Sequence, residues 1–98
     1  MRYEIEKTVV FDNWLKNLKD RQAVLTISMR LTRVALGNFG DTKLVGSGVY
    51  ELRLFTGPGY RIYYTIRNGT VVLLLVGGNK SSQERDVSKA KELAKALR

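Results

Sequence analysis

The sequence contains neither cysteine nor histidine among its 98 residues. Without cysteine the chain cannot form disulfides or thiolate metal sites, and without histidine it lacks the commonest general base and the commonest metal ligand. Any chemistry must therefore come from arginine, lysine, tyrosine, carboxylates or hydroxyls. We expect no metal and no other cofactor.

Long apolar segments are also missing. The longest uninterrupted apolar run, Val71 to Val76, is far too short to span a bilayer, and the N-terminal residues lack the apolar core of a signal peptide. We therefore expect a cytoplasmic protein with no membrane partner. A chain of this length fits one compact domain, residues 1–98, with a core of its own.

Acidic residues are outnumbered by basic ones. Seventeen lysines and arginines against nine aspartates and glutamates give a formal net charge of +8. Such a charge favours a polyanionic partner, either nucleic acid or the ribosome. The alternative is a surface whose charges serve only solubility.

The first half of the sequence predicts a strand followed by a helical hairpin. Apolar and charged residues alternate from Tyr3 to Glu6, which is typical of a short strand. One helical face is then predicted by the i, i+3, i+4, i+7 spacing of Phe11, Trp14, Leu15 and Leu18. Asp20 can cap a second helix that ends near Gly37 and buries Val24, Ile27, Leu31 and Val34.

The second half predicts three consecutive strands and a last helix. Residues 43–45 form at most a brief extended piece, and Gly57-Pro58-Gly59 separates two longer β-rich runs. Asn68-Gly69 predicts a type I′ hairpin into the run Val71 to Val76. Ser81 and Glu84 have the spacing of a capping box. The helix behind them has an apolar stripe of Val87, Ala90, Leu93, Ala94 and Leu97.

These elements predict an α+β fold with the order β-α-α-β-β-β-α, in which helices pack on one face of a small antiparallel sheet. Period-two alternation points Tyr50, Leu52, Leu54, Ile62, Tyr64 and Ile66 toward the helices. It leaves the opposite face, expected to meet solvent, with Glu51, Arg53, Arg61, Tyr63 and Arg67. The last strand is apolar on both sides, with Val72, Leu74 and Val76 on one side and Leu73 and Leu75 on the other, and is expected to be central.

Three cations on adjacent strands or their ends could converge on one ligand. Because neighbouring strands lie about 4.8 Å apart, Arg53, Arg61 and Lys80 are predicted to bind one phosphate, the arginines as forks and the lysine as a point charge. Tyr63 could stack on a nucleobase for about 1–3 kcal/mol. In the alternative interpretation the arginines are solubilising, and Arg53 pairs with Glu51 for less than about 1 kcal/mol.

Two blocks of the sequence carry a family resemblance. The segments "GSGVYELRLFTGPGYRIYYT" and "VVLLLVGGNKSSQERDVSKAKELA", together with the first helix and its tryptophan, resemble the addiction-module killer proteins, a HigB-like branch of the RelE/ParE toxin superfamily. The resemblance covers nearly the whole chain. The fold it implies, a β-α-α-β-β-β sandwich, agrees with the order predicted from the residues.

The resemblance implies a type II toxin that a cognate antitoxin, expected to be a helix-turn-helix protein, holds inert. RelE-like members cleave messenger RNA in the ribosomal A site without a metal, and the 2′-hydroxyl attacks the adjacent phosphate to leave a 2′,3′-cyclic phosphate. By position, Arg61 matches the arginine that holds the scissile phosphate, Lys80 the basic residue at the end of the last strand, and Arg53 a strand cation that is often lysine. Since arginine is a poor base, Glu51 or Lys80 would have to accept the proton.

Further cations are predicted to flank this site and to contact RNA: Lys43, Arg67, Arg85 and Lys89. Two alternatives remain open. One is a ParE-like inhibitor that binds DNA gyrase without cutting RNA, and the other is a non-catalytic protein that only binds an antitoxin. A nuclease requires the three-cation cluster intact, whereas a gyrase inhibitor would tolerate its loss.

Overall fold

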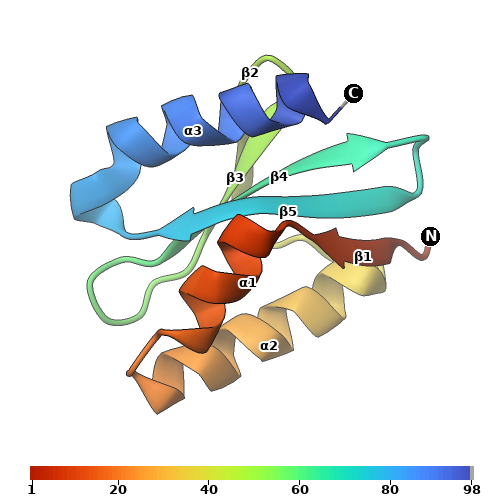
Figure 1. The fold of residues 1–98 in the computed structure, drawn as a ribbon. Helices are drawn as coiled ribbons and strands as arrows, with labels where there is room; N and C mark the ends of the chain where they lie inside the picture. The colour runs from red at the N-terminus through yellow and green to blue at the C-terminus, as the bar shows by residue number, and fades with distance from the viewer. Residues whose placement is uncertain (98) are drawn as a thin grey trace.

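The computed structural model describes residues 1–97 and arranges them as a five-stranded sheet with helices on both faces (Figure 1). The strands are β1 (Glu4–Lys7), β2 (Thr42–Gly46), β3 (Val49–Arg53), β4 (Arg61–Arg67) and β5 (Val71–Gly78). The helices are α1 (Val9–Lys16), α2 (Arg21–Ala35) and α3 (Gln83–Ala96), with a 3-10 turn, η1 (Lys80–Ser82), before α3. The α+β class and the order of the predicted elements are confirmed. The brief piece expected at 43–45 is a full strand, β2.

The strands lie in the order β1-β5-β4-β3-β2, so β4 is the middle strand, and β5 lies inside the sheet between β1 and β4, as its two-sided apolar pattern requires. All neighbours are antiparallel except β1, which runs parallel to β5. The β4–β5 hairpin turns at Asn68 and Gly69, which both have positive φ, 53° and 69°. This is the backbone that a type I′ turn requires, and it explains the Asn-Gly pair.

The helices α1 and α2 each begin at a side chain that accepts a hydrogen bond from the first turn. Thr8 accepts from the Phe11 amide at 3.0 Å, and Asp20 accepts from the Ala23 amide at 3.1 Å, as predicted for Asp20. The capping box predicted at Ser81 is wrong. The 3-10 turn η1 is capped two residues earlier, at Asn79. The Asn79 side-chain oxygen accepts a hydrogen bond from the Ser81 backbone amide, and the Asn79 backbone amide donates to the Ser82 hydroxyl.

One face of the sheet packs against α1 and α2. Phe11 of α1 and Ile27 of α2 are fully buried there against Leu52 and Ile62 of the strands. The set of inward residues predicted from strand alternation is the set that this core contains, with Tyr50 and Ile66 partly buried at its edge. This face therefore follows the sequence pattern directly.

The opposite face is covered by α3, so the prediction that all helices share one face is wrong for the last helix (Figure 1). Ala90 and Ala94 of α3 pack on Val49, Tyr63 and Leu75. The physical reason is that β5 is apolar on both sides, and its second side needs a cover as much as its first.

A bulge in β5 changes which side chains face α3. The β4–β5 register shifts between Tyr63 and Tyr64, and Val76 joins the α3 face instead of the face of Val72. Bulges of this kind re-aim the residues that follow.

Beyond the bulge, two glycines let both helices approach the strand closely. A Cβ at Gly77 would overlap the ring of Trp14 on α1, and a Cβ at Gly78 would overlap the carboxylate of Asp86 on α3. The Gly-Gly pair thus lets a helix pack on each side of the end of β5, the end that leads to Lys80.

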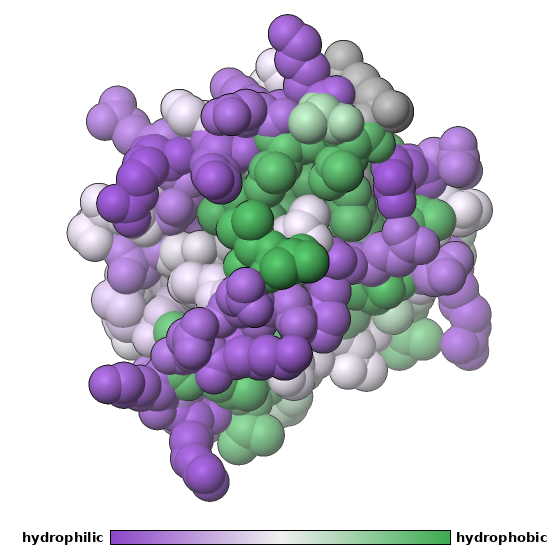
Figure 2. Space-filling view, viewed as in Figure 1, coloured by the Kyte–Doolittle hydropathy of each residue, from purple (hydrophilic) through white to green (hydrophobic). Residues whose placement is uncertain are grey.

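Between α1 and α3 some apolar side chains reach the surface, where Figure 2 shows a hydrophobic strip bordered by polar residues. The strip belongs to a groove of about 420 Å³ whose apolar lining is Val9, Val10, Leu73, Leu93 and Leu97. Among the residues described, no helix combines the length and apolar character needed to cross a membrane.

Candidate anion-binding site

Two arginines lie directly opposite each other on the α3 face of the sheet. Arg53 at the end of β3 pairs in register with Arg61 at the start of β4, and Arg61 pairs in turn with Gly78 of β5. The side chains of Arg53 and Arg61 are 33% and 15% exposed. The structure therefore brings together the two arginines that the sequence predicts to converge.

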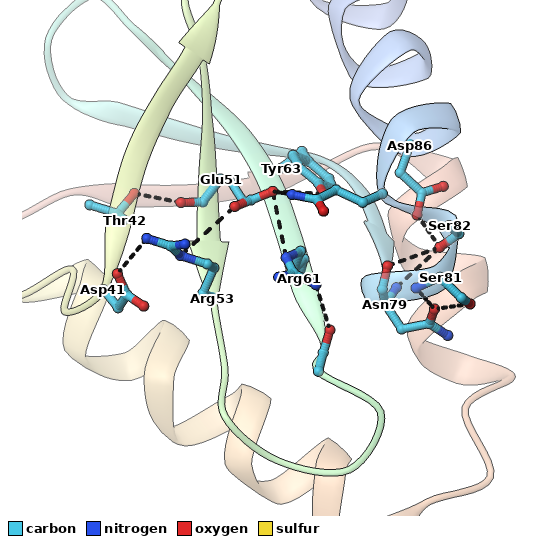
Figure 3. Close-up of polar contacts among 12 residues, drawn as sticks. Asp41, Thr42, Glu51, Arg53, Arg61, Tyr63, Asn79, Ser81, Ser82 and Asp86 are labelled. Carbon is cyan, nitrogen blue, oxygen red and sulfur yellow. Dashed lines mark hydrogen bonds and ion pairs between the residues drawn. The ribbon is translucent and has the colours of Figure 1, made fainter.

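The carboxylate of Glu51 lies between these arginines and is fully buried (Figure 3). Its Oε2 accepts hydrogen bonds from the Tyr63 hydroxyl and the Gln83 amide, both at 2.9 Å. Arg61 Nε lies 3.6 Å from Oε2, and Arg53 Nε lies 3.8 Å from Oε1. Both arginine distances are those of ion pairs without a hydrogen bond.

The result is a buried cluster with unused hydrogen-bonding capacity. Glu51 Oε1 and the Nε atoms of Arg53 and Arg61 are buried and have no hydrogen-bond partner. Each arginine instead uses its outer nitrogens. Arg53 donates to Asp41 at 3.2 Å, and Arg61 donates to the Gly59 carbonyl at 3.3 Å. The arginines are thus held in place without being saturated.

Lys80 joins the cluster from the end of β5. Its amide donates to the Pro58 carbonyl at 3.4 Å, and a Cβ on Gly59 would lie 3.4 Å from the Lys80 Cβ and 3.7 Å from Arg61 Nη1. Gly59 has a φ of +77°, so glycine suits this close approach in both space and backbone conformation. The predicted proximity of Lys80 to Arg61 is therefore found, and Lys80 is exposed.

Two of the predicted site residues are buried, which changes their roles. Tyr63 is fully buried under α3, so the prediction that it stacks on a nucleobase is wrong. Burial, followed by its hydrogen bond to Glu51, raises the pKa of Tyr63 well above its usual range. Glu51 itself is enclosed by Tyr63 and Gln83, so the prediction that it takes a proton from a substrate hydroxyl is also wrong. It acts instead as the counter-charge that holds the arginines.

The flanking cations predicted to contact RNA divide into two groups. Lys43 lies across from Glu51 on β2, and it lines, together with Arg85, an open groove of about 710 Å³ between β2 and α3. Lys89 is exposed one turn further along α3. Arg67 is different. It lies at the other end of β4, about 20 Å from Arg61 at the usual rise per residue, and pairs with Glu6 at 2.7 Å, so the prediction that it flanks the cluster is wrong.

Sequence reasoning missed two parts of the site. The sequence predicts Gln83, which covers Glu51, only as part of a helix start, and it predicts a loop for the segment that contains Asp41, which holds Arg53. A third buried group, Asp86, accepts from the Ser82 hydroxyl beside Gly78 (Figure 3). The Gly-Gly pair was a usable signal for a close helix, but it does not specify a carboxylate.

The arrangement is suited to binding an anion. Arg53 and Arg61 face the carboxylates of Glu51 and Asp41 with side chains that are partly exposed, and exposed Lys80 adds a third positive charge beside Gly59. A phosphate would meet fork-shaped donors and a point charge. Within the described part of the chain, no group of three or more acidic side chains converges as a metal site would need.

Comparison with known proteins places this geometry in a family. A protein of Haemophilus influenzae, itself uncharacterized, is 46% identical over 97 residues, which cover 99% of this chain and 98% of that protein. In structure, the free state of an arginine-to-alanine mutant of the E. coli toxin RelE matches with a TM-score of 0.77 at 20% identity, over 94% of this chain and 97% of the other. The intact E. coli RelBE toxin–antitoxin complex matches with a TM-score of 0.62, also at 20% identity, over 79% of this chain and 95% of the other.

At that identity the likeness to RelE shows a shared fold, and it confirms at that level the resemblance to the RelE/ParE superfamily found in the sequence blocks. The model of the family described as phage-derived protein Gp49-like (DUF891) matches residues 13–98. Because this match spans most of the sequence, the chain belongs to the Gp49-like family of phage-derived proteins.

Proposed function

We propose that this chain is the toxin of a type II toxin–antitoxin pair and that it cleaves messenger RNA on the ribosome. The observation that carries the proposal is the Arg53–Arg61–Lys80 cluster, in which two unsaturated arginines flank a buried carboxylate and an exposed lysine lies beside Gly59, next to Arg61. The fold shared with RelE, which is named as a toxin, and with the toxin–antitoxin complex RelBE supports it. The excess of basic residues is consistent with an RNA target.

In the proposed reaction a ribose 2′-hydroxyl attacks the adjacent phosphorus. The hydroxyl proton passes to a base, the bond from O2′ to phosphorus forms, and the bond from phosphorus to O5′ breaks as the leaving oxygen takes up a proton. Arg61 and Lys80 stabilise the charge that develops on the phosphate oxygens. Lys80, as the exposed member of the cluster, can approach the reacting oxygens, while Glu51 holds Arg61 in position.

The test compares Arg61→Ala with the wild type at equal soluble expression, with growth arrest on induction and A-site cleavage of message as readouts. Losing one preorganised donor to the developing oxyanion is expected to lower the rate about 10²–10³-fold. Arg61→Lys should recover only part, because a fork becomes a point charge. Arg2→Ala, which removes an exposed arginine near the N-terminus, is the matched control and should leave both readouts unchanged.

Folding is controlled separately, because the Arg61 side chain is mostly buried. Lys80→Ala removes an exposed side chain and should lower cleavage without lowering the melting temperature. Growth arrest without message cleavage, unchanged in Arg61→Ala, would contradict the nuclease and favour a gyrase-type target. No growth arrest at all would favour a protein that only binds an antitoxin.

Ribosome binding is tested by co-sedimentation at rising salt. If Lys43, Arg85 and Lys89 contact RNA phosphates, the logarithm of the binding constant should fall with the logarithm of salt concentration by about 0.7–0.9 per contact. Replacing the three with glutamine should flatten this dependence. Retention on the ribosome that hardly changes with salt would count against binding through these cations.

A further inference from the structure

The outer side of α2 carries an apolar stripe that the fold does not use. The helix buries Ala23, Ile27 and Val34 toward the sheet. On its opposite side, Leu25 and Met29 are each 59% exposed, and Leu36 at the C-cap is 55% exposed. A helix that packs one apolar face on a core normally has a polar outer face. Figure 1 shows α2 at the periphery of the fold, with no other element packed beyond it.

The three exposed side chains form one surface. At 3.6 residues per turn, positions 25, 29 and 36 fall within about 40° of one another around the helix axis. We call Leu25, Met29 and Leu36 the α2 stripe. Its neighbours around the helix include Arg21 on one side and Arg33 on the other.

The charges around the α2 stripe all have one sign. From Arg21 to Ala35 the helix contains three arginines and no acidic residue. Within residues 1–97, neither Arg21 nor Arg33 forms an ion pair. An apolar centre with a charged rim is the usual layout of a protein–protein interface, and here the rim is cationic and unpaired.

We propose that the α2 stripe and its arginines are the docking surface for an acidic amphipathic helix of a partner protein. The proposal rests on the proposed function, since the partner is the antitoxin that a type II toxin requires. Apolar side chains of the partner cover the stripe, and carboxylates on both sides of its helix pair with Arg21 and Arg33.

Other occupants fit this surface less well. A second copy of this chain would bring the arginines of two α2 helices together with no acidic residue of either helix between them, which is repulsive. RNA would satisfy the arginines but would place exposed leucine and methionine against a charged backbone. The groove between α1 and α3 is apolar too, but the two cations that line it, Lys7 and Arg67, already pair with Asp12 and Glu6.

The position of α2 also connects this surface to the cation cluster. The Asp20 carboxylate that caps α2 lies 3.6 Å from the position of a Cβ on Gly57, in the loop that carries Gly59 beside Arg61 and Lys80. A partner chain that follows α2 past Arg21 therefore arrives at the loop that borders the cluster.

Because a toxin and its antitoxin are expected to be encoded side by side, the experiment uses the purified products of the two genes that flank the gene of this chain. Their affinity for it is measured by calorimetry at 0.15 M salt. The double variant Leu25→Glu/Met29→Glu places carboxylates where the partner's apolar residues would pack, and should weaken binding at least about 30-fold, as loss of an interface centre does. Val9→Glu is the matched control. It changes an exposed apolar residue outside the α2 stripe, 75% exposed in the first turn of α1, where a carboxylate favours the helix, and should leave affinity within about twofold.

A second variant tests the charges. Arg21→Gln/Arg33→Gln should lower the association rate about tenfold at low salt and flatten its salt dependence. Equal affinity of Leu25→Glu/Met29→Glu and the wild type, a loss of affinity in Val9→Glu alone, or no binding by the wild type would overturn the proposal. Two further results would overturn it, because each would show another occupant of the α2 stripe. One is a dimer of this chain in light scattering that Leu25→Glu/Met29→Glu abolishes, and the other is pelleting with phosphatidylserine vesicles that the same double variant abolishes.

The two proposals fail separately. Leu25 and Met29 lie on the outer side of α2, across the sheet from the face that carries Arg53 and Arg61, so Leu25→Glu/Met29→Glu should still arrest growth and cleave message if the wild type does. If Leu25→Glu/Met29→Glu cleaves message and also binds the partner with normal affinity, the proposed docking surface is wrong and the proposed nuclease activity is supported. If the double variant loses binding but the wild type never cleaves message, the docking surface stands and the nuclease is wrong.

Discussion

The two faces of the sheet bury different kinds of side chain. Between the sheet and α1 and α2 the core is apolar and aromatic, with stacked rings of Tyr50 and Tyr64 at its edge. Between the sheet and α3 lie Glu51 and Asp86, the two buried carboxylates of the described residues. The first face therefore supplies stability through packed volume alone, while the second adds to its own apolar cluster a set of charges held in fixed positions.

This difference changes what each face is sensitive to. An apolar face loses stability when atoms are removed and a cavity remains. A face with a buried carboxylate depends on keeping that charge matched, because its desolvation is offset only by its partners. For Glu51 these are Tyr63, Gln83 and the two arginines, and the arginine contacts are the looser ones.

The largest loss of stability is expected on the apolar face, from Trp14→Ala. The Trp14 ring packs on Gly77, and its centroid lies 5.7 Å from that of Phe11 and 6.1 Å from that of Tyr60. Removing it should lower the free energy of unfolding by about 3–5 kcal/mol, measured by denaturant titration. Phe55→Ala, which changes an aromatic that is 84% exposed, should stay within about 0.5 kcal/mol. A Trp14→Ala protein as stable as Phe55→Ala would show that the ring is not part of the core.

Removing the buried charge should have a somewhat smaller effect, because the arginines can turn toward solvent. Glu51→Ala leaves Tyr63 and Gln83 without their acceptor and Arg53 and Arg61 without a shared counter-charge. We expect a loss of about 3 kcal/mol in the free energy of unfolding. Glu51→Gln keeps the shape and an acceptor and should lose less. If both variants unfold like the wild type, the carboxylate does not hold this face together.

Tyr63→Phe tests the same cluster with a smaller expected loss of stability, and it also tests how the stability of the fold depends on pH. At neutral pH the loss of one hydrogen bond to a carboxylate should lower stability by about 1.5–3 kcal/mol. Burial raises the pKa of Tyr63 above its unfolded value near 10, so the folded chain keeps a proton that the unfolded chain releases. The stabilisation is complete below pH 10 and declines above it. Melting temperature should therefore fall more steeply above pH 10 in the wild type than in Tyr63→Phe, and parallel curves would contradict this.

The sequence predicts the apolar face better than the charged one, and the reason is physical. Alternation assigns residues such as Leu52 and Arg53 to opposite faces, because the pleat allows no other arrangement. It does not say which helix covers a face, so Glu51 and Tyr63 were expected in solvent and lie under α3. The decisive signal was the two-sided apolar pattern of β5, which required a second cover.

The candidate site was predicted in part for the same reason. Convergence of Arg53, Arg61 and Lys80 follows from strand order and register, which local patterns constrain. The roles of Gln83 and Asp41 depend on how a helix and a loop dock, and that is a tertiary property. Local sequence patterns carry no direct signal for it.

The smallest effect is expected where the charged face reaches solvent. Arg67 and Glu6 are 40% and 44% exposed and pair at 2.7 Å, at the end of β4 remote from Glu51. An exposed pair in high dielectric contributes about 0.2–1 kcal/mol, so a double-mutant cycle with Arg67→Gln and Glu6→Gln should give a coupling energy in that range, lower in 1 M salt. Because Arg67 lies away from the cation cluster and Lys43 lies across from Glu51, Arg67→Gln should bind the ribosome like the wild type, whereas Lys43→Gln should bind it more weakly. A coupling energy above about 2 kcal/mol would show that the exposed Arg67–Glu6 pair is held as tightly as the charges beside Glu51. Charge would then be held tightly along the whole of β4, and exposure of one end of the strand would make no difference.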